Sequence, residues 1–580
     1  MLAPAAWNMA SAQTAITYAF AGSSAAGGLT GTGTLNPYGP TTIFVATGGS
    51  GSQFTVTFAN GSTMTATSLT NASGTTITGT ANITGGTGTF TGVTGSFNFL
   101  LNLTGSSSTG VTFTVSGSGT LNGAPPPSST SYYFSHLAFG GGFQATLTYV
   151  NYTPTPVTCT TKFYSNSGIP LQIPFAQGNI TTRIDSMPQG GSIHDQTTAD
   201  LAANLSQGWA TASCTGPVQA SLLYRYFQSG AAVGEASVSA EVVPVFKFVT
   251  FAQAAAQGST GVAYANPAGN QSATFTFTAF DATGAQLGTA TRTLGPSTHS
   301  SDTVSTLLGL SNFTGSLVIT STIPAISLSL NAEAFPVFSS LPPGDLSPIA
   351  LTGTQTYYLS HLAFAGGFQT TLTYINYGTQ AVTCTTKFYA DSGLPLNIPF
   401  AQGTISTRTD ALAPGASIHD QTTADLGAPG AQGWAIATCT GPVQASLLYR
   451  LYQSNSGAPT AVGEASVNAE TAPTTKFATF AQTATGVAYA NPSTTQSASV
   501  TLKVFSAGGV QMGSKVVTLG PLGHSAANLG DLLGVASFSG FVAVSSDIPI
   551  VSLSLNAEAF PVFSSLPPGD LPNAATIVSP

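Results

Sequence analysis

Apolar and polar residues alternate in short runs along most of this chain. Residues 54–58, Phe-Thr-Val-Thr-Phe, and residues 97–103, Phe-Asn-Phe-Leu-Leu-Asn-Leu, are two such runs, and Gly, Ser and Thr separate the runs. Because the side chains of a strand alternate between its two faces, this pattern predicts half-buried β-strands joined by turns. Residues 300–308 and 525–533 depart from it and predict a short helical turn, capped by Ser or Asp near its start. We therefore expect an all-β protein.

The second feature is an internal repeat, because residues 131–346 return with little change as residues 356–571. An older duplication inside each copy aligns residues 433–439 with residues 540–546, so the repeating unit is about 110 residues long. Three residues mark each copy: Cys159, Trp209 and Cys214 in the first, and Cys384, Trp434 and Cys439 in the second. In the later unit of the second copy, Phe541 takes the place of the Trp, and Val500 and Ser546 take the places of the cysteines.

Five folded regions are expected. Residues 13–122 contain no Lys, Arg, Asp, Glu or His and form a small all-β domain, either a β-barrel or a β-sandwich. Four tandem Ig-like β-sandwiches of about seven strands follow in two duplicated pairs. They are module 1 (131–243), module 2 (244–346), module 3 (356–472) and module 4 (473–571). Linkers are expected at 123–130 and 347–355 and a tail at 572–580. The proline-rich ends of the modules, residues 339–346 and 564–571, predict modules strung along a semi-rigid line.

Composition narrows the partners. Charged residues make up 5% of the chain and the net charge is −8, so Gly, Ser, Thr and Ala must form much of the surface. The 11 basic residues are scattered and leave no patch that could neutralise phosphates, which argues against nucleic acid as a partner. No run approaches the roughly 18 apolar residues that cross a bilayer, so no transmembrane segment is expected.

Two observations favour secretion. Residues 1–12 end in Ala-Ser-Ala, a small-residue cleavage pattern that predicts the remnant of a secretion signal; an alanine-rich N-terminus without structure is the alternative. The four cysteines form two equivalent pairs without C-x-x-C or metal-ligand spacing, which predicts two disulfides and an oxidising compartment. The alternative is four free, buried cysteines. The expected bridges join Cys159 to Cys214 and Cys384 to Cys439.

Two resemblances extend this picture. Residues 83–97, Ile-Thr-Gly-Gly-Thr-Gly-Thr-Phe-Thr-Gly-Val-Thr-Gly-Ser-Phe, resemble the glycine-rich turn of small secreted β-barrels related to dirigent proteins and allene oxide cyclases. We interpret these glycines as turn residues with positive φ rather than as ligand contacts. Residues 367–376 and the sequence Gly433-Trp434-Ala435 resemble the tandem sandwich repeats of large secreted bacterial proteins. That resemblance implies secretion and carries no activity.

The string at residues 192–201, Ser-Ile-His-Asp-Gln-Thr-Thr-Ala-Asp-Leu, is the most site-like segment and is identical at residues 417–426. Its His and Asp side chains could supply a base, an orienting acid or metal ligands. They are His194, Asp195 and Asp200 in the first copy, and His419, Asp420 and Asp425 in the second. A recent duplication would also preserve the string, and it aligns with the capping segment of the next module, where Asp195 would be an N-cap. We interpret it as structural, with a metal site or catalysis as alternatives, and expect no cofactor.

Other polar and aromatic residues offer fewer sites. All six histidines recur in both copies and none has a second His at metal-binding spacing, so we expect surface or turn histidines. Arg225 and Arg450 lie in strand-like runs, where they either pair with the rare acids or extend along a sheet edge. The aromatic pairs that open each copy could stack on sugar rings and form a ligand face. These are Tyr132 and Tyr133, and Tyr357 and Tyr358.

Together these features predict a non-enzymatic secreted or cell-surface protein with a role in adhesion or in an extracellular matrix. Self-association through exposed sandwich edges, or binding to an extracellular polysaccharide, would supply the partner. A carbohydrate-binding protein that uses the exposed tyrosines is the alternative. A secreted hydrolase that uses the His and Asp string is the third hypothesis.

Overall fold

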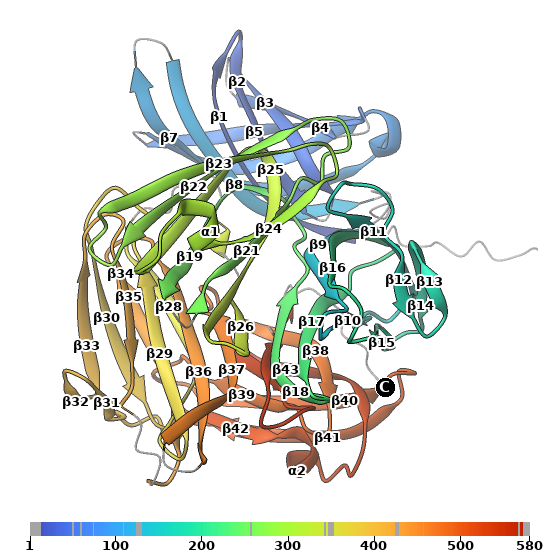
Figure 1. The fold of residues 1–580 in the computed structure, drawn as a ribbon. Helices are drawn as coiled ribbons and strands as arrows, with labels where there is room; N and C mark the ends of the chain where they lie inside the picture. Colours follow the sequence, from blue (N-terminus) through green and yellow to red (C-terminus); the bar gives the residue numbers. More distant parts are fainter. Residues whose placement is uncertain are drawn as a thin grey trace, which may run out of the picture. The chain divides into compact units, whose positions relative to one another are not determined.

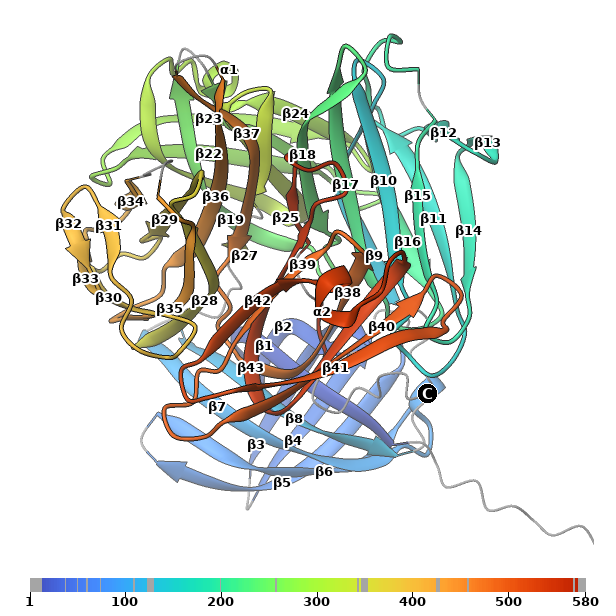
Figure 2. The same cartoon turned by 90° about the horizontal axis from the view of Figure 1, so that it is seen from below.

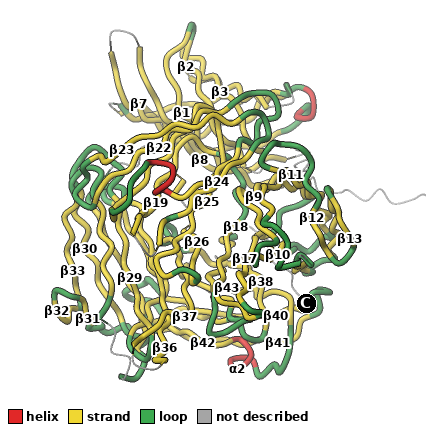
Figure 3. Tube along the Cα trace, viewed as in Figure 1, coloured by secondary structure: helices red, strands yellow, loops and turns green. Residues whose placement is uncertain are grey.

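Strands form nearly all the regular structure of the computed structural model, which confirms the all-β prediction (Figures 1 and 3). The structure describes residues 13–36, 38–48, 51–58, 61–73, 75–107, 110–122, 130–198, 200–255, 258–341, 344–345, 353–423, 428–455, 458–566 and 569–571. The predicted signal remnant, most of both linkers and the tail from 572 lie outside these ranges. The chain divides into two units, one that ends at Thr130 and one that begins at Ser131.

The first unit is a closed antiparallel barrel in which each strand pairs with the next and the last pairs with the first. Inward positions hold apolar residues such as Phe20, Phe54 and Phe113. Within the glycine-rich turn, Gly88 and Gly92 have positive φ values of 59° and 79°, which fits the predicted turn role. The strands are β1 (Gln13–Ala25), β2 (Gly28–Asn36), β3 (Gly39–Gly48), β4 (Gly51–Phe58), β5 (Thr63–Ser73), β6 (Thr76–Gly86), β7 (Thr94–Ser107) and β8 (Gly110–Asn122), with the 3-10 turn η1 (Gly88–Phe90) before β7.

Module 1 consists of two 4-stranded antiparallel sheets with a shared apolar core, plus a small hairpin. One sheet has the order β14-β11-β16-β9 and the other β15-β10-β17-β18, so the module has eight main strands instead of about seven. The bounds are β9 (Thr130–Phe139), β10 (Phe143–Val150), β11 (Val157–Ser165), β12 (Ile173–Phe175), β13 (Gly178–Ile180), β14 (Thr182–Met187), β15 (Ser192–Gln196), β16 (Ser206–Cys214), β17 (Gln219–Gln228) and β18 (Ala231–Ser239).

Module 2 repeats this order with one change: the long strand β25 takes the places of both β16 and β17 and runs through both sheets. Its N-terminal part pairs with β19 and β22, and its C-terminal part pairs with β21 and β26. The bounds are β19 (Val245–Ala255), β20 (Gly258–Ser259), β21 (Gly261–Ala265), β22 (Ala273–Asp281), β23 (Gln286–Leu294), β24 (His299–Thr303), α1 (Val304–Leu308), β25 (Phe313–Ala334), β26 (Val337–Leu341) and β27 (Gly344–Asp345).

Modules 3 and 4 reproduce the strand order of modules 1 and 2, except that the two-residue strand β20 has no counterpart in the described part of module 4. Module 3 contains β28 (Gln355–Phe364), β29 (Phe368–Ile375), β30 (Val382–Tyr389), β31 (Ile398–Phe400), β32 (Gly403–Ile405), β33 (Thr407–Leu412), β34 (Ser417–Gln421), β35 (Ala431–Cys439), β36 (Gln444–Asn455) and β37 (Ala458–Asn468). Module 4 contains β38 (Thr474–Gln482), β39 (Gly486–Ala490), β40 (Ala498–Ser506), β41 (Gln511–Leu519), β42 (His524–Asn528), α2 (Leu529–Leu533), β43 (Ser539–Asn556), β44 (Ser564–Leu566) and β45 (Gly569–Asp570).

The predicted helical turns are present as α1 and α2, but they are shorter than expected. The preceding residues continue as strands β24 and β42, and the caps are Thr303 and Asn528 rather than Ser or Asp. Both side chains accept a hydrogen bond from a backbone N–H of the first turn, which is how an N-cap satisfies an unpaired donor. Each described α-helix has five residues, so neither could span a bilayer.

Both expected disulfides are present, Cys159–Cys214 and Cys384–Cys439. Each joins directly opposed residues of neighbouring strands in one sheet, with the Cα atoms 4.0 Å apart. The immunoglobulin disulfide instead joins the two sheets, so the Cys-Trp-Cys spacing does not reproduce that arrangement here. In module 4, Val500 and Ser546 stand opposite each other at the same register position, which agrees with the internal alignment.

The four modules do not form a string; they close into a ring. Module 1 contacts modules 2 and 4, and module 3 contacts modules 2 and 4 (Figure 2). The innermost strands β18, β26, β37 and β44, one from each module, meet at the centre. The prediction of modules on a semi-rigid line is therefore wrong, because it considered the linkers and not the outer faces of the modules, which are apolar enough to pack on one another.

Candidate functional site

The two histidines of the site-like string are packing residues at module boundaries. The His194 ring stacks on Phe480 of module 4 with ring centres 3.9 Å apart, and Nδ1 lies 2.9 Å from Thr148 Oγ1. His419 stacks in the same way on Phe251 of module 2, at 3.8 Å. Burial lowers the pKa of both imidazoles to about 4, so they are neutral near pH 7. The neutral imidazole rings thus act as packing groups, His194 on Phe480 and His419 on Phe251.

The aspartates of the string face elsewhere. Asp195 lies on strand β15 and pairs with Arg183 of the neighbouring edge strand β14, and Asp185 shares that guanidinium. The N-cap predicted for Asp195 is wrong, because β15 continues through it. Asp200 is exposed and accepts a hydrogen bond from the Ala202 backbone N–H.

The second copy repeats the pairing of Asp420 with Arg408, at 2.5 Å, while Asp425 lies outside the described residues. Successive residues of a strand point to opposite faces, so His194 and Asp195 diverge. The string therefore does not assemble its side chains into one site. No group of three or more His, Cys, Asp and Glu that could hold a metal occurs in the described part of the chain.

The predicted aromatic ligand face does not form. Tyr132 and Tyr357 are each 4% exposed, and the Tyr132 hydroxyl bonds the backbone of Val218. Tyr133 and Tyr358 are half-buried at the boundary with the next module, packed near Trp209 and Trp434. This correction has a simple cause: strands β9 and β28 are covered on one face by the opposing sheet and on the other by the adjoining module.

Buried ion pairs with several supporting hydrogen bonds lie at the module boundaries. Arg225 of β17 pairs with Glu235 of β18 and, across the module boundary, with Glu558 of module 4. The other oxygen of Glu235 accepts hydrogen bonds from Asn556 Nδ2 and Ser564 Oγ, at 2.8 and 2.7 Å. Burial raises the pKa of Glu235, and Arg225 opposes that rise. All three residues that hydrogen-bond the carboxylate, Arg225, Asn556 and Ser564, are donors, so the network fits its ionised form.

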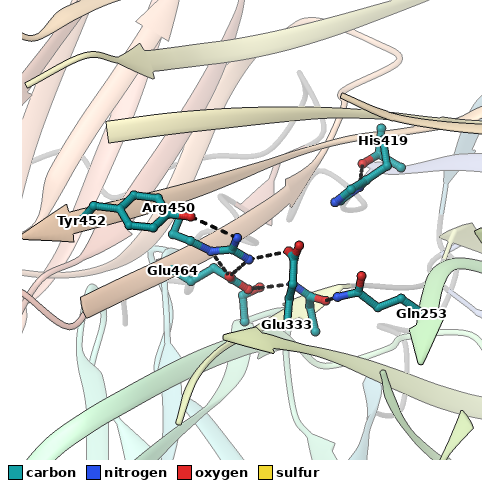
Figure 4. Close-up of polar contacts among 9 residues, drawn as sticks. Gln253, Glu333, His419, Arg450, Tyr452 and Glu464 are labelled. Carbon is teal, nitrogen blue, oxygen red and sulfur yellow. Dashed lines mark hydrogen bonds and ion pairs between the residues drawn. The ribbon is translucent and has the colours of Figure 1, made fainter. Parts of the chain in front are cut away.

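The second copy contains the equivalent network between modules 3 and 2 (Figure 4). Arg450 pairs with Glu464 at 2.5 Å and with Glu333 at 2.6 Å, and its guanidinium lies between the two carboxylates. Asn331 and Ser339 donate to the remaining Glu464 oxygen. Of the two alternatives for Arg225 and Arg450, pairing with the rare acids is the one observed.

A closed cycle of serine hydrogen bonds marks the centre of the ring. Each hydroxyl donates to the backbone carbonyl of the next serine, and all four residues are 0–1% exposed. The order is Ser237 to Ser565, Ser565 to Ser466, Ser466 to Ser340, and Ser340 to Ser237. Sequence reasoning missed this cycle because single serines in a chain so rich in serine carry no signal.

Trp209 and Trp434 join each pair of modules. Trp209 lies five residues before Cys214 on β16, so its side chain points away from the module core and toward module 2. Its Nε1–H donates to the Ser297 carbonyl at 2.8 Å, and Trp434 donates to Leu522 at the same distance. The Trp therefore marks a module boundary rather than a disulfide-packed core.

Buried histidine pairs also join modules 1 and 2 and modules 3 and 4. His136 Nδ1 is 3.1 Å from His299 Nε2, and His361 and His524 repeat that contact. Burial lowers the pKa of His136 to about 4 and that of His361 to about 3. The prediction of surface or turn histidines is wrong for these four residues. Each member is unremarkable in the sequence, and only the packing of two modules brings the rings together.

Four strands, one from each module, end a sheet at equivalent positions and pair on one side only: β14, β23, β33 and β41. Each carries one basic residue: Arg183, Arg292, Arg408 and Lys515. On β14 and β33 the Arg and a neighbouring Asp point inward and are buried. Inward-pointing charges and exposed Lys are devices by which edge strands avoid pairing with other molecules.

Comparison with known proteins adds little. No family model matches the chain, and no curated protein matches it. Thermotoga maritima 1070 is a similar solved structure with 14% identity and a TM-score of 0.15, covering 20% of this chain and 94% of its own. The pterocarpan synthase dirigent protein GePTS1 is similar with 16% identity and the same TM-score, covering 21% and 96%. Likenesses this weak carry no argument about the fold or the function of this chain.

Proposed function

We propose that this chain is a non-enzymatic secreted or cell-surface protein that acts as a rigid scaffold in adhesion or in an extracellular matrix. The proposal rests on one observation: the buried ionic groups at the module boundaries have a structural role. Arg225, Arg450 and their glutamates lock modules together, and His194 and His419 cover aromatic rings. Charged residues make up only 5% of the chain, so the surface that remains is poor in charge and rich in Thr and Ser.

Secretion is supported by the two disulfides, which persist in oxidising compartments. We also assign the modules to the Ig-like sandwiches in the broad sense of two packed antiparallel sheets. The charges on the edge strands β14, β23, β33 and β41 oppose pairing of these strands with other molecules. The scaffold is therefore proposed to act as a single ring that binds a surface, and not through edge-to-edge filaments.

Carbohydrate binding is the second candidate, with residues other than the predicted tyrosines. Phe143, Tyr226 and Phe335 form a row of rings with centres 4.7 and 5.5 Å apart, and Phe335 is 51% exposed. Exposed aromatic rings are the surfaces on which sugars stack. In the second copy Leu451 replaces Tyr226, so a sugar-binding row would belong to the first copy.

The test is binding of the full-length, non-reduced chain to extracellular polysaccharide and to intact cells, with size exclusion and light scattering to define its mass. We expect a discrete particle that is retained on one of these surfaces. Loss of polysaccharide retention in Tyr226→Leu, with cell binding intact, would assign sugar binding to the aromatic row. Turnover of any substrate that disappears in His194→Ala/His419→Ala would overturn the non-enzymatic proposal.

A further inference from the structure

A cavity of about 350 Å³ lies between modules 1 and 2, and its lining residues come from both modules. On the side of module 2, Ala263 and Ser301 stand opposite each other on β21 and β24. Ala263 packs against the core of module 1, so this face of the two strands is the one toward module 1. The neighbouring residues Val262 and Asp302 face the opposite way, into module 2. Ser301 is thus a polar side chain on the cavity wall.

On the side of module 1, the wall combines apolar residues such as Phe143 with two polar side chains, His136 and Gln207. Both polar side chains reach across the boundary. His136 Nδ1 lies 3.1 Å from His299 Nε2, and the Ser301 hydroxyl donates to Gln207 Oε1 at 3.1 Å. Small-molecule sites have volumes of about 300–1,000 Å³ and mainly apolar walls with a few polar groups, which describes this cavity.

The hydrogen bonds of the histidine pair determine its tautomers. Burial lowers the pKa of both imidazoles, that of His136 to about 4, so both rings are neutral near pH 7. His299 Nδ1 contacts the side-chain oxygen of Asn166, which can only accept, so Nδ1 carries the proton and Nε2 does not. His136 Nδ1 must then donate to His299 Nε2. This leaves His136 Nε2 as an unprotonated acceptor.

That acceptor has no partner in the described part of the chain, although His136 is only 5% exposed. Nε2 is not one of the fully enclosed, unpartnered polar atoms of the described residues, so it keeps accessible surface, and His136 lines the cavity. Gln207 Nε2, which also has no hydrogen-bond partner among the described residues, supplies a donor on the same wall. A ligand that donates to Nε2 would restore a hydrogen bond to a group that folding has removed from bulk water.

The second copy differs at three residues that line the cavity or contact the histidine pair. Asn166 is replaced by Asp391, Leu205 by Gly430, and Ser301 by Ala526. Gln432, the counterpart of Gln207, donates from Nε2 to Asp391 at 2.9 Å, so its amide is already engaged. The free amide donor, the hydroxyl and the leucine side chain are therefore specific to the first copy.

We propose that the cavity between modules 1 and 2 binds a small phenol whose hydroxyl donates to His136 Nε2. The Gln207 amide donates to the phenol oxygen, and the aromatic ring is buried against Phe143 and Leu205. A phenol is neutral near pH 7, whereas an amine or an acid would bring a charge into a largely apolar cavity. The volume is sufficient, because an apolar cavity of about 150 Å³ already admits benzene. This inference is independent of the scaffold function, because it concerns a site inside the ring.

The probe is p-cresol, titrated into the full-length, non-reduced protein at pH 7 and followed by ligand-observed NMR. We expect saturable binding with a Kd of about 1 mM, typical of so small a ligand. The methyl ether 4-methylanisole keeps the ring but has no O–H donor, so it should bind about tenfold more weakly. Equal affinity for the two compounds, or no saturation by p-cresol at about 10 mM, ten times the expected Kd, would overturn the proposal.

The variant His136→Asn tests the acceptor. Asparagine keeps an N–H donor near the position of Nδ1, so it can still bond His299, but it has no counterpart of Nε2. The Kd of p-cresol should rise by about tenfold, and that of 4-methylanisole should not change. An equal change for both compounds would overturn the proposal, because the hydroxyl would then make no bond to His136.

A pair of glycine variants tests the location. A Cβ at Gly261, which lines the cavity, would meet only Leu330 Cβ at 3.9 Å, so Gly261→Leu fills the cavity without a backbone clash. The matched control is Gly486→Leu in the second copy, where the nearest atom is Leu555 Cβ at 3.8 Å. We expect the first variant to abolish p-cresol binding and the second to leave it unchanged. Binding that persists in Gly261→Leu would place the probe elsewhere and overturn the proposal.

Discussion

The two halves of the ring, residues 131–346 and 356–571, share one strand order and the same boundary contacts but differ at a few interior positions. Arg225 with Glu558 mirrors Arg450 with Glu333, and Trp209 mirrors Trp434. The histidine pairs differ in one partner. In the first half, His299 contacts Asn166, whereas in the second half His524 contacts Asp391. The two halves thus allow a direct comparison in which one hydrogen-bond partner of a buried histidine changes while the fold around it stays the same.

The difference at the histidine pairs is electrostatic. His299 Nδ1 lies 2.9 Å from the Asn166 side-chain oxygen, whereas His524 Nδ1 lies 2.7 Å from a carboxylate oxygen of Asp391. Partial burial raises the pKa of Asp391, but hydrogen bonds from His524 and Gln432 lower it more, so the net shift is downward. The second half therefore carries an anion, the half-exposed Asp391 carboxylate, beside its imidazoles, and the first half lacks it.

The largest expected effect is shared by both halves and concerns acid. Burial lowers the pKa of five histidines, so the unfolded chain takes up protons below about pH 6.5 while the folded chain does not. They are His136, His194, His299, His361 and His419. The free energy of unfolding should fall by on the order of 5 kcal/mol between pH 7 and pH 5, measured by guanidinium unfolding.

Two glutamates act in the opposite direction in this acid experiment. Glu235 and Glu464 have raised pKa values in the folded protein, so these two groups increase the free energy of unfolding as the pH falls. Five histidines act in the opposite direction, so the net effect of acid is a loss of stability. Equal unfolding midpoints at pH 7 and pH 5 would contradict the burial of the histidine rings.

The next effect tests whether the two ionic networks are equivalent. Arg225→Met and Arg450→Met each leave a buried glutamate without its counter-ion, which costs about 3–5 kcal/mol. We expect similar losses in chemical denaturation, because the two networks have equivalent ion pairs; Arg450 has one further, long hydrogen bond, to the Tyr452 hydroxyl at 3.4 Å. Arg292→Met, on the exposed edge strand β23, is the control and should change stability by no more than about 0.5 kcal/mol. A loss of stability in only one of the two variants would show that the two networks do not contribute equally to the free energy of unfolding, although their structures are similar.

The disulfides come third. Replacing both cysteines of one bridge with Ala, in either half, should cost up to about 4 kcal/mol, because each bridge closes a loop with a sequence separation of 55. The unbridged module 4 holds Val500 opposite Ser546 at this position, so the sheets are expected to form without the bond. Reducing and non-reducing thermal scans of the four-cysteine protein and the two variants measure the difference. An unchanged melting temperature after removal of both bridges would refute a stabilising role.

The smallest expected effect comes from exchanging the residue beside the histidine pair between the two halves. Asn166→Asp places a carboxylate beside His299 and should raise the pKa of the His299 imidazole by about one unit, worth about 1.4 kcal/mol. Asp391→Asn should lower the pKa of His361 further, because the carboxylate that favours its protonated form is removed. Imidazole NMR titrations of the two variants report both shifts. Shifts of the opposite sign would show that hydrogen-bond geometry, and not charge, distinguishes the pairs.

Much of the local structure could be predicted from the sequence. The alternation of residues 54–58 and 97–103 corresponds to strands β4 and β7, and the repeat spacing led to the paired cysteines. The candidate site could not be predicted. His194 and Asp195 are adjacent in the sequence but belong to opposite faces of β15, and each finds its partner on another element.

What the sequence determined by itself was the all-β class, the repeated modules, the disulfides and the helical turns, because these depend on short-range periodicity and on spacing within one unit. Only the tertiary structure decided that the modules close into a ring. Arg225 meets Glu558 across 333 residues, and Ser237 meets Ser565 across 328. On an isolated strand such residues have the pattern of a solvent-exposed face. They become interior only when another module supplies the surface that excludes water, and no local pattern records that partner.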